Sequence, residues 1–341
     1  MQRCLDLARH GWPHVAPNPM VGCVIAVGDR ILAEGFHRKV GGPHAEIHAL
    51  DAVSEADRPL LPEATLYVNL EPCAHHGRTP PCSDRIVREG VGRVVVAMTD
   101  PHEQVAGRGI DRIRRAGIDV VTGVCEGEAR RLNRRFVVNH EAHRPYIVLK
   151  WARSADGFFA PIEPRQQWIT GPESRQLVHR WRSEEAGIAV GANTVRIDDP
   201  ALTNRLWHGR SPLRLVIDRD GDLATSEASV LADGNPTVVY TSEAPATDRG
   251  PHVETVVVPR PGFLEAVVAD WSGRDLASVM VEGGRDLLNA FIAADLWDEA
   301  RILTGPDALG EGRAAPHIHG ALIDEAAIGR DRLHIHERSA R

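Results

Sequence analysis

The chain carries four residues whose types and spacing fit a catalytic zinc site. His44 and Glu46 lie two positions apart, and Cys73 and Cys82 follow within the stretch 71–82. One imidazole and two thiolates give zinc three protein ligands and leave a fourth position for water. Zinc lowers the pKa of such a water to near neutral, and Glu46 is placed to carry its proton to a leaving group.

The cysteine pair has two interpretations. The order H-x-E followed by P-C is the signature of zinc deaminases, although here eight residues rather than two separate the cysteines. The alternative is a disulfide between Cys73 and Cys82, or two buried thiols. Five cysteines, an odd number, and no N-terminal export signal predict a cytoplasmic protein, where disulfides are rare. We therefore favour zinc, and assign Cys4, Cys23 and Cys125 to packing.

The predicted elements place these residues at element ends. A helix is expected to begin at His44, and a strand over 65–70 ends just before Cys73. A second helix over 83–89 puts Cys82 at a helix N-terminus, where the helix dipole favours a thiolate. Ligands that lie at strand ends and helix starts make a rigid site.

The composition fits an ordinary globular protein with two domains. The 341 residues are 43% hydrophobic and 26% charged, which argues against wholesale disorder. Lys and Arg number 40 against 47 Asp and Glu, and the net charge of −7 disfavours a general nucleic-acid-binding protein. No apolar run approaches the roughly 18 residues that a membrane-spanning helix needs.

Strands and helices alternate in the first half, which predicts a sheet covered by helices on both faces. The second half restarts with a strand and adds further strands and helices, so we expect an α/β fold. We place the boundary in the polar stretch 139–145, which gives domains 1–143 and 144–341. In the first half, strands are expected over 21–27, 31–34, 65–70, 93–98 and 118–122, and helices over 44–53, 83–89 and 110–116. In the second half, strands are expected over 146–151, 187–191, 213–217 and 276–281, and helices over 172–183 and 286–294.

A Gly-Gly turn stands between the last of these strands and its helix. Gly283 and Gly284 would let backbone amides approach a phosphate at the helix N-terminus. A lone Gly-Gly pair is weak support for a phosphate site, and an ordinary turn is the alternative. The sequence contains no G-x-G-x-x-G, so a Rossmann dinucleotide site is not predicted.

Short motifs run in order along nearly the whole chain. In the first half they are P-N-P-M-V-G at 17–22, H-A-E at 44–46, L-E-P-C at 70–73, G-R-T-P-P-C at 77–82, D-P at 100–101 and V-A-G-R-G at 105–109. In the second half they occupy 150–157, 168–171, 190–194, 198–200 and 281–284. Together they resemble the bifunctional riboflavin-biosynthesis deaminase–reductase family, in which the long spacing between the cysteines is the family's own pattern.

The resemblance implies an N-terminal cytidine-deaminase-like three-layer α/β/α domain and a C-terminal dihydrofolate-reductase-like α/β domain. It implies that the first domain hydrolyses the 2-amino group of 2,5-diamino-6-(5-phosphoribosylamino)pyrimidin-4-one. The second would use NADPH to reduce the ribosyl group of 5-amino-6-(5-phosphoribosylamino)uracil to ribityl. The expected partner is thus a small phosphoribosyl-pyrimidine, with no nucleic acid and no membrane, and we expect a homo-oligomer.

Position-by-position matching to the family implies the residues of each site. Zinc would be held by His44, Cys73 and Cys82, with Glu46 as the catalytic residue. The deaminase substrate would meet Asn18, His37 and Arg78. NADPH would contact Ala152, Trp168, Thr194, Asp198, Arg219 and Gly284. The reductase substrate would contact Gln166, Arg182, Leu202, Arg205 and Glu282. Paired arginines suit a sugar phosphate, because a guanidinium binds phosphate oxygens bidentately, although a solvated surface arginine is the common alternative.

The chain departs from the family pattern at several positions. Gln166 stands where Ser is common, Ala155 where Leu is common, and His102 where Asn is common. Arg219 follows the strand 213–217, where the family often has Ser or Thr. It would either pair with the 2′-phosphate of NADPH or lie on the surface beside the neighbouring aspartates.

Two rival functions remain open from the sequence. One keeps the deaminase and makes the second domain a non-catalytic binding or oligomerisation module. The other is a zinc deaminase that acts on nucleic acid, which the net charge and the lack of an aromatic-rich basic stripe disfavour.

Overall fold

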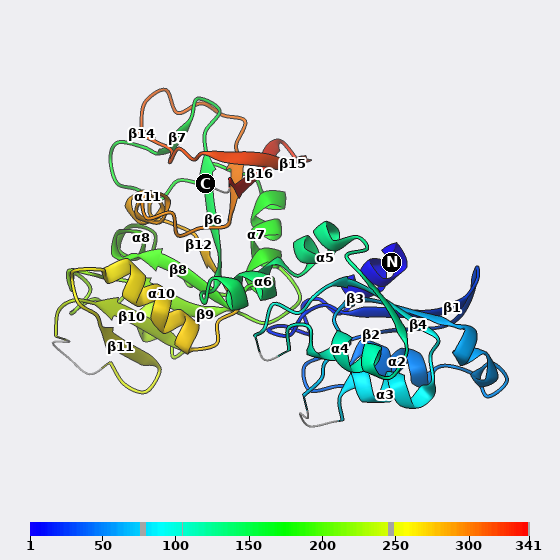
Figure 1. The fold of residues 1–341 in the computed structure, drawn as a ribbon. Coiled ribbons are helices and arrows are strands. Elements are labelled where there is room, and N and C mark those ends of the chain that lie inside the picture. The colour runs from blue at the N-terminus through cyan, green and yellow to red at the C-terminus, as the bar shows by residue number, and fades with distance from the viewer. Residues whose placement is uncertain (76–79, 104, 245–248, 340–341) are drawn as a thin grey trace. The chain divides into compact units, whose positions relative to one another are not determined.

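The computed structural model describes residues 1–75, 80–103, 105–244 and 249–339, and divides into two compact units (Figure 1). The first unit is Met1–His143 and the second is Arg144–Arg341. Helix α6 (Arg134–Glu141) ends the first unit and occupies the start of the polar stretch 139–145. The sequence predicts no helix there.

The first unit is built on a five-stranded sheet in the order β2-β1-β3-β4-β5. Its strands are β1 (Gly22–Val27), β2 (Arg30–Phe36), β3 (Thr65–Leu70), β4 (Arg93–Met98) and β5 (Asp119–Thr122). β1 pairs antiparallel with β2 and with β3, and the remaining neighbours are parallel. Gly28 closes the β1–β2 turn with a φ of 53°, a conformation that glycine adopts without steric cost.

Helices cover both faces of this sheet. They are α1 (Gln2–Arg9), α2 (Ala45–Asp51), α3 (Cys82–Glu89), α4 (Arg108–Arg115), α5 (Glu126–Leu132) and α6. Successive side chains of a strand point to opposite faces, and Val24 packs with Leu7 of α1 while Ile25 joins the core that contains Leu50 of α2. The predicted three-layer α/β/α arrangement is therefore confirmed.

The second unit is built on a nine-stranded sheet in the order β11-β10-β9-β8-β12-β6-β13-β16-β15. Its strands are β6 (Tyr146–Arg153), β8 (Gly187–Gly191), β9 (Leu213–Ile217), β10 (Thr237–Thr241), β11 (Val253–Val257), β12 (Ser278–Val281), β13 (Glu299–Thr304), β15 (Gly320–Ile328) and β16 (Asp331–Arg338). All neighbours from β11 to β13 are parallel, and β16 and β15 complete the sheet as an antiparallel pair. β7 (Phe158–Ala160) and β14 (Arg313–Ala314) form a separate small pair.

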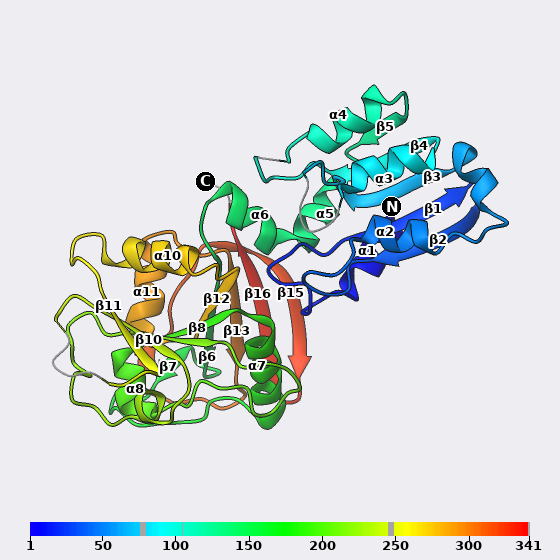
Figure 2. The same ribbon diagram turned by 90° about the horizontal axis from the view of Figure 1, so that it is seen from below.

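Two groups of helices cover the two faces of this sheet (Figure 2). α10 (Phe263–Gly273) and α11 (Arg285–Ala293) pack on the face that includes Ala189 and Leu215. α8 (Ala192–Asp198) and α9 (Ser229–Ala232) pack on the opposite face, with Ile188, Val190 and Val216. α7 (Pro172–Glu184) is the longest helix among the described residues. The predicted α/β class thus holds for both units.

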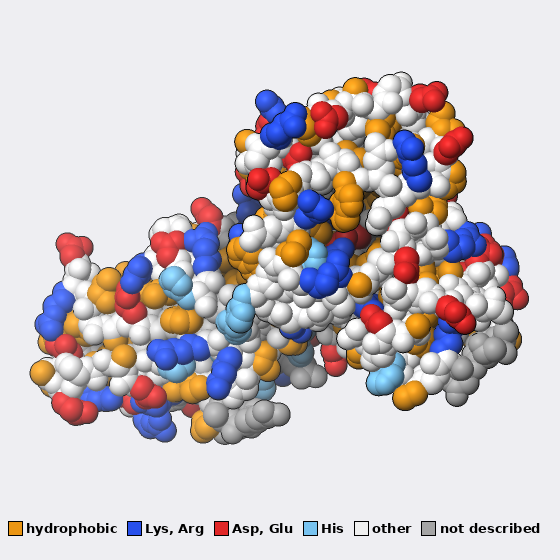
Figure 3. Space-filling view, turned by 180° about the vertical axis from the view of Figure 1, so that it is seen from behind, with side chains coloured by type: hydrophobic (Ala, Val, Ile, Leu, Met, Phe, Trp, Pro, Cys, Tyr) orange, Lys and Arg blue, Asp and Glu red, His pale blue; other side chains and the backbone are white. Residues whose placement is uncertain are grey.

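The face of the molecule drawn in Figure 3 has no single dominant charge. On the face drawn in Figure 3, acidic and basic side chains are interspersed over the described residues, as the small net charge leads one to expect. Within the described ranges, no helix is both long enough and apolar enough to cross a membrane.

Candidate functional site

The three predicted zinc ligands converge at the ends of elements in the first unit. His44 immediately precedes α2, Cys73 follows β3, and Cys82 is the first residue of α3. The Nδ1 atom of His44 lies 3.3 Å from the Sγ atom of Cys82 and 3.7 Å from that of Cys73. All three ligand atoms lie within 4.8 Å of one another. The predicted disulfide alternative is excluded, because both cysteines are free thiols.

The spacing and protonation of this triad fit a zinc ion. Tetrahedral coordination with ordinary Zn–N and Zn–S bond lengths places a nitrogen and a sulfur ligand about 3.6 Å apart, close to both observed distances. The backbone N–H of Cys82 donates a 3.3 Å hydrogen bond to the Sγ atom of Cys73. The adjacent Cys82 thiol, the imidazole of His44 and this N–H together lower the pKa of the Cys73 thiol. The arrangement favours the thiolate that a metal requires.

Glu46 lies in the first turn of α2, beside the triad. Its side chain is buried and lines the same cavity, of about 360 Å³, as His44 and Cys73. Burial raises the pKa of the Glu46 carboxyl. A carboxyl group with a raised pKa next to a metal ligand set is suited to accept a proton and to donate it again.

Asn18 and His37 lie in this cavity and contact each other. The Nδ1 atom of His37 lies 3.0 Å from the carbonyl oxygen of Pro43, which can only accept, so Nδ1 carries the proton. The Nε2 atom therefore accepts from the amide nitrogen of Asn18 at 3.3 Å. Burial lowers the pKa of His37, which keeps the ring neutral. Arg78, the third predicted substrate contact, lies outside the described residues.

Two acidic residues near the zinc-fitting triad, Glu71 and Asp100, are not among the site residues predicted from the sequence. Glu71 is buried, and its carboxylate accepts hydrogen bonds from the backbone N–H groups of Gly107 and Gly109, both at 2.9 Å. It thereby fixes the loop that leads into α4. Asp100 lines the cavity, and burial raises the pKa of its carboxyl. The motifs at 70–73 and 100–101 contain both residues, but spacing alone does not reveal these contacts.

In the second unit, the predicted pair Arg182 and Glu282 forms a buried ion pair. Arg182 donates from Nε and Nη2 to the two oxygens of Glu282, each at 2.8 Å. Lys150 of β6 places its Nζ atom 3.8 Å from the same carboxylate. Burial raises the pKa of Glu282, but the positive charges of Arg182 and Lys150 outweigh burial and lower it to about 2. Burial lowers the pKa of Lys150.

Leu202 and Arg205 lie on a loop that α7 holds in place. Arg182 donates to the carbonyl oxygen of Thr203 at 3.0 Å, and the backbone N–H of Arg205 donates to Nδ1 of His179 at 2.9 Å. Burial, followed by the charges of Arg182 and Arg205, lowers the pKa of His179 to about 4, so its Nδ1 stays an acceptor at neutral pH. His179 thus positions the loop, a contact the sequence does not indicate.

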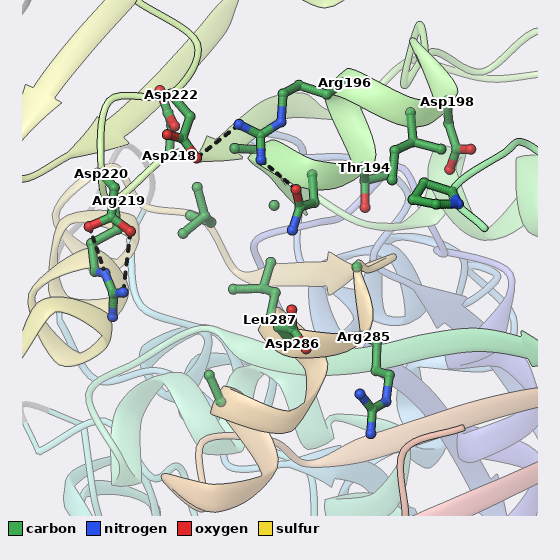
Figure 4. Close-up of a pocket in the computed structure, with 18 of the residues that line it drawn as sticks. Thr194, Arg196, Asp198, Asp218, Arg219, Asp220, Asp222, Arg285, Asp286 and Leu287 are labelled. Atoms are coloured by element: carbon green, nitrogen blue, oxygen red, sulfur yellow. Dashed lines mark hydrogen bonds and ion pairs between the residues drawn. The ribbon is translucent and has the colours of Figure 1, made fainter. Parts of the chain in front are cut away.

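A second cavity, of about 550 Å³, brings together four of the six residues predicted to contact the cofactor. Thr194 and Asp198 come from α8, Gly284 precedes α11, and Arg219 follows β9 (Figure 4). The cavity therefore lies at the carboxyl ends of parallel strands, where ligands bind in open α/β sheets. Ala152 and Trp168 are not among the residues that line it.

The Gly-Gly turn leaves room for a ligand at the start of α11. Gly283 has a φ of 126°, which other residues rarely adopt, and a Cβ atom on Gly284 would lie 3.0 Å from the hydroxyl oxygen of Thr194. Backbone and hydroxyl groups can therefore approach a phosphate closely here, at the positive end of a nine-residue helix. The donor set fits the pyrophosphate of a dinucleotide such as NADPH.

The remaining predicted reductase residues are more exposed. Gln166 donates to the carbonyl oxygen of Asp198 at 3.4 Å and is otherwise solvent-facing. Trp168 is 65% exposed, and the guanidinium of Arg175 lies over its ring, 4.7 Å from the ring centre. The structure thus links Arg182 to Glu282 and to the loop that carries Leu202 and Arg205.

Both sites and both folds define a class. A three-layer unit with a His-Cys-Cys triad and a buried glutamate is that of a zinc deaminase. A largely parallel sheet with a glycine-lined cavity at its strand ends is typical of a nucleotide-binding enzyme. The chain is a two-domain enzyme of these two kinds.

Comparisons with known proteins define the family. Residues 1–98 match the cytidine and deoxycytidylate deaminase zinc-binding region, and residues 145–336 match the RibD C-terminal domain. The riboflavin biosynthesis protein RibD of Aquifex aeolicus is 39% identical over 329 residues, which cover 96% of this chain and 91% of that protein. The RibD of Escherichia coli is 39% identical over 327 residues, covering 91% and 88%.

Solved structures agree with this assignment. A diaminohydroxyphosphoribosylaminopyrimidine deaminase/5-amino-6-(5-phosphoribosylamino)uracil reductase of Thermotoga maritima superposes with a TM-score of 0.88 at 34% identity, covering 99% of this chain and 97% of that one. RibD of Acinetobacter baumannii gives a TM-score of 0.87 at 34% identity, covering 99% and 98%. The chain belongs to the RibD family of riboflavin-biosynthesis proteins and is a bifunctional deaminase and reductase.

Proposed function

We propose that the first unit deaminates 2,5-diamino-6-(5-phosphoribosylamino)pyrimidin-4-one and that the second reduces 5-amino-6-(5-phosphoribosylamino)uracil. One observation carries this proposal: a zinc-fitting triad and a buried Arg182–Glu282 cluster occur on separate units of one chain. Two different chemistries on one substrate skeleton need two such sites.

In the first unit, His44, Cys73 and Cys82 would hold zinc. Bound there, the zinc ion would act as a Lewis acid and lower the pKa of a bound water, which makes that water nucleophilic near neutral pH. Glu46, buried beside the triad, accepts the proton of the attacking water and returns it to the departing amine, which leaves as ammonia. Asn18 and neutral His37 present polar groups to the same cavity and orient the substrate. Arg78 remains a predicted contact.

In the second unit, NADPH would contact Thr194, Asp198, Arg219 and Gly284. Bound there, NADPH would supply the hydride that reduces C1′ of the ribosyl group, so that the ribosyl group becomes a ribityl chain. Lys150, whose pKa burial lowers, lies beside Glu282 and is suited to deliver the proton that accompanies reduction. Arg182 holds Glu282 and the 202–205 loop, which presents Arg205 for the substrate phosphate. Ala152, Trp168, Gln166 and Leu202 remain predicted contacts.

The experiment that tests this assignment supplies the diaminopyrimidine with and without NADPH. Ammonia should be released in both cases, whereas NADPH should be consumed only after deamination, and one molecule per ammonia. Ammonia release with no NADPH consumption would instead support the deaminase-only alternative.

Five free thiols suit a reducing compartment, so we place the protein in the cytoplasm. The homo-oligomer predicted from the resemblance remains a prediction, which the mass of the protein in solution would test.

A further inference from the structure

The cofactor cavity of the second unit extends beyond the residues that the pyrophosphate would need. Gly284 follows β12, two residues after Glu282, and Thr194 lies in α8, which follows β8; both strands lie near the centre of the sheet. The reactive end of the cofactor must approach Glu282 and Lys150, so the adenosine end must run outward. The next strand in that direction is β9, and the cavity continues to Arg219 and Asp220 just beyond its end.

Two arginines from different segments meet at this outer rim. Arg219 follows β9, while Arg260 lies in the connection between β11 and α10. Both pair with one carboxylate: Asp220 lies 3.3 Å from Arg219 and 2.9 Å from Arg260. Glu243 holds Arg260 at 2.7 Å on its other side. Two guanidinium groups thus converge on a single anionic group at the mouth of the cavity.

The other arginines of the cavity are held differently. Arg196 pairs with Asp222 at 2.9 Å and also contacts the side chain of Asn193 (Figure 4). Arg285 donates to the backbone carbonyl of Ala314 at 2.8 Å. Neither shares a carboxylate with a second arginine in the contacts described. Asp220, by contrast, pairs with two arginines. An anion that took the place of its carboxylate would therefore contact two guanidinium groups.

We propose that Arg219 and Arg260 together form the subsite for the 2′-phosphate of NADPH, with the phosphate replacing Asp220 as their shared partner. The proposal rests on the proposed reductase function. The side chains of Arg219 and Arg260 are 58% and 55% exposed, and ion pairs as exposed as these contribute little to stability. A phosphate dianion that accepts charge-assisted, bidentate hydrogen bonds from two guanidiniums outcompetes one exposed carboxylate. NADH lacks this group and gains nothing from either arginine.

The test measures binding of 2′,5′-ADP and 5′-AMP to the full chain by calorimetry, because these probes differ only in the 2′-phosphate. Wild type should bind 2′,5′-ADP more tightly. Arg219→Ala and Arg260→Ala should each lower this preference by roughly fivefold or more, as expected for losing hydrogen bonds to a charged group, and leave 5′-AMP binding unchanged. The Michaelis constant of NADPH should correspondingly rise relative to that of NADH in both variants.

Arg332→Ala is the matched control, since Arg332 is an exposed arginine paired with Glu325 at 3.0 Å on β16. It should keep the wild-type preference. A wild-type preference in Arg260→Ala, equal to that of Arg332→Ala, would overturn the subsite while leaving the reductase assignment intact. A wild-type protein that binds neither probe nor NADPH would overturn the reductase assignment and the subsite with it.

Discussion

The two sites of this chain differ in what balances their buried negative charge. In the first unit, Glu46 and two cysteines surround one histidine, so the thiolate form of the site is anionic and calls for an external cation. In the second unit, Glu282 lies between Arg182 and Lys150, and the cluster supplies its own counter-charges. The first site therefore needs a metal ion to balance its charge, whereas in the second site Arg182 and Lys150 provide the positive charge.

This difference has a physical consequence for what each site tolerates. Without the metal, the first site lacks the ion that would activate water, so it loses its chemistry. Removing one partner from the second site leaves a buried charge without compensation, which destabilises the fold around it. The following predictions test this contrast from the largest effect to the smallest.

Loss of a zinc ligand should have the largest effect. Cys73→Ser should remove zinc from a protein that otherwise carries about one ion per chain, as a single three-ligand site requires, and should abolish ammonia release. Reduction of supplied deaminated intermediate should continue, because the zinc-fitting triad belongs to the first unit. Metal analysis and the two rate assays check this. Cys125→Ser is the control, since Cys125 is a free cysteine outside the triad; equal zinc loss in both variants would contradict the assignment.

Glu46→Gln should keep the metal and lose the chemistry. Glutamine has the same size but cannot take a proton from water, so the deamination rate should fall by roughly 10² or more. Zinc content should match wild type, because Glu46 is not one of the three ligands. Near-normal turnover would show that another group moves the proton.

Glu282→Gln should destabilise the second unit as well as stop reduction. The substitution leaves Arg182 and Lys150 buried without their carboxylate, a loss of roughly 3–5 kcal/mol in the free energy of unfolding. Denaturant unfolding of the second unit measures it. Glu254→Gln, at an exposed ion pair with Arg274, should cost no more than about 1 kcal/mol. Equal losses of stability in the two variants would show that the Glu282 carboxylate does not stabilise the buried charges of Arg182 and Lys150.

The same carboxylate should give a smaller, pH-dependent effect. The pKa of Glu282 is lowered from 4.5 to about 2 in the folded protein, so its contribution is present above the unfolded value and is lost as pH falls through the folded value. The stability difference between wild type and Glu282→Gln should therefore shrink as the pH is lowered below about 4.5. A difference that is constant over this range would contradict the lowered pKa.

The first site was more predictable from sequence than the second, for a physical reason. His44, Cys73 and Cys82 adjoin a helix start, a strand end and a helix start, and such elements follow from local residue patterns. The contact between Arg182 and Glu282 joins residues 100 positions apart, and no local pattern records it.

The same reason explains the residues that were missed. His179 accepts a hydrogen bond from the backbone N–H of Arg205, on a loop far away in the sequence. Arg260 and Arg219 reach the same carboxylate, Asp220, because β9 and β11 flank β10 in the sheet. Strand β15 was missed because it is an exposed edge strand whose side chains lack a buried alternating face. Trp168 was predicted from the family resemblance; its side chain is 65% exposed, and its contact with the cofactor stays a prediction.

The central claim is that two separate sites act in sequence, and NADPH consumption by Glu46→Gln tests it most directly. The variant is given either the diaminopyrimidine or the deaminated intermediate, at equal concentrations. With the diaminopyrimidine, consumption should fall with the deamination rate, by roughly 10² or more. With the intermediate, it should equal the wild-type rate. Loss of consumption with both compounds in folded, zinc-loaded protein would contradict the two-site account.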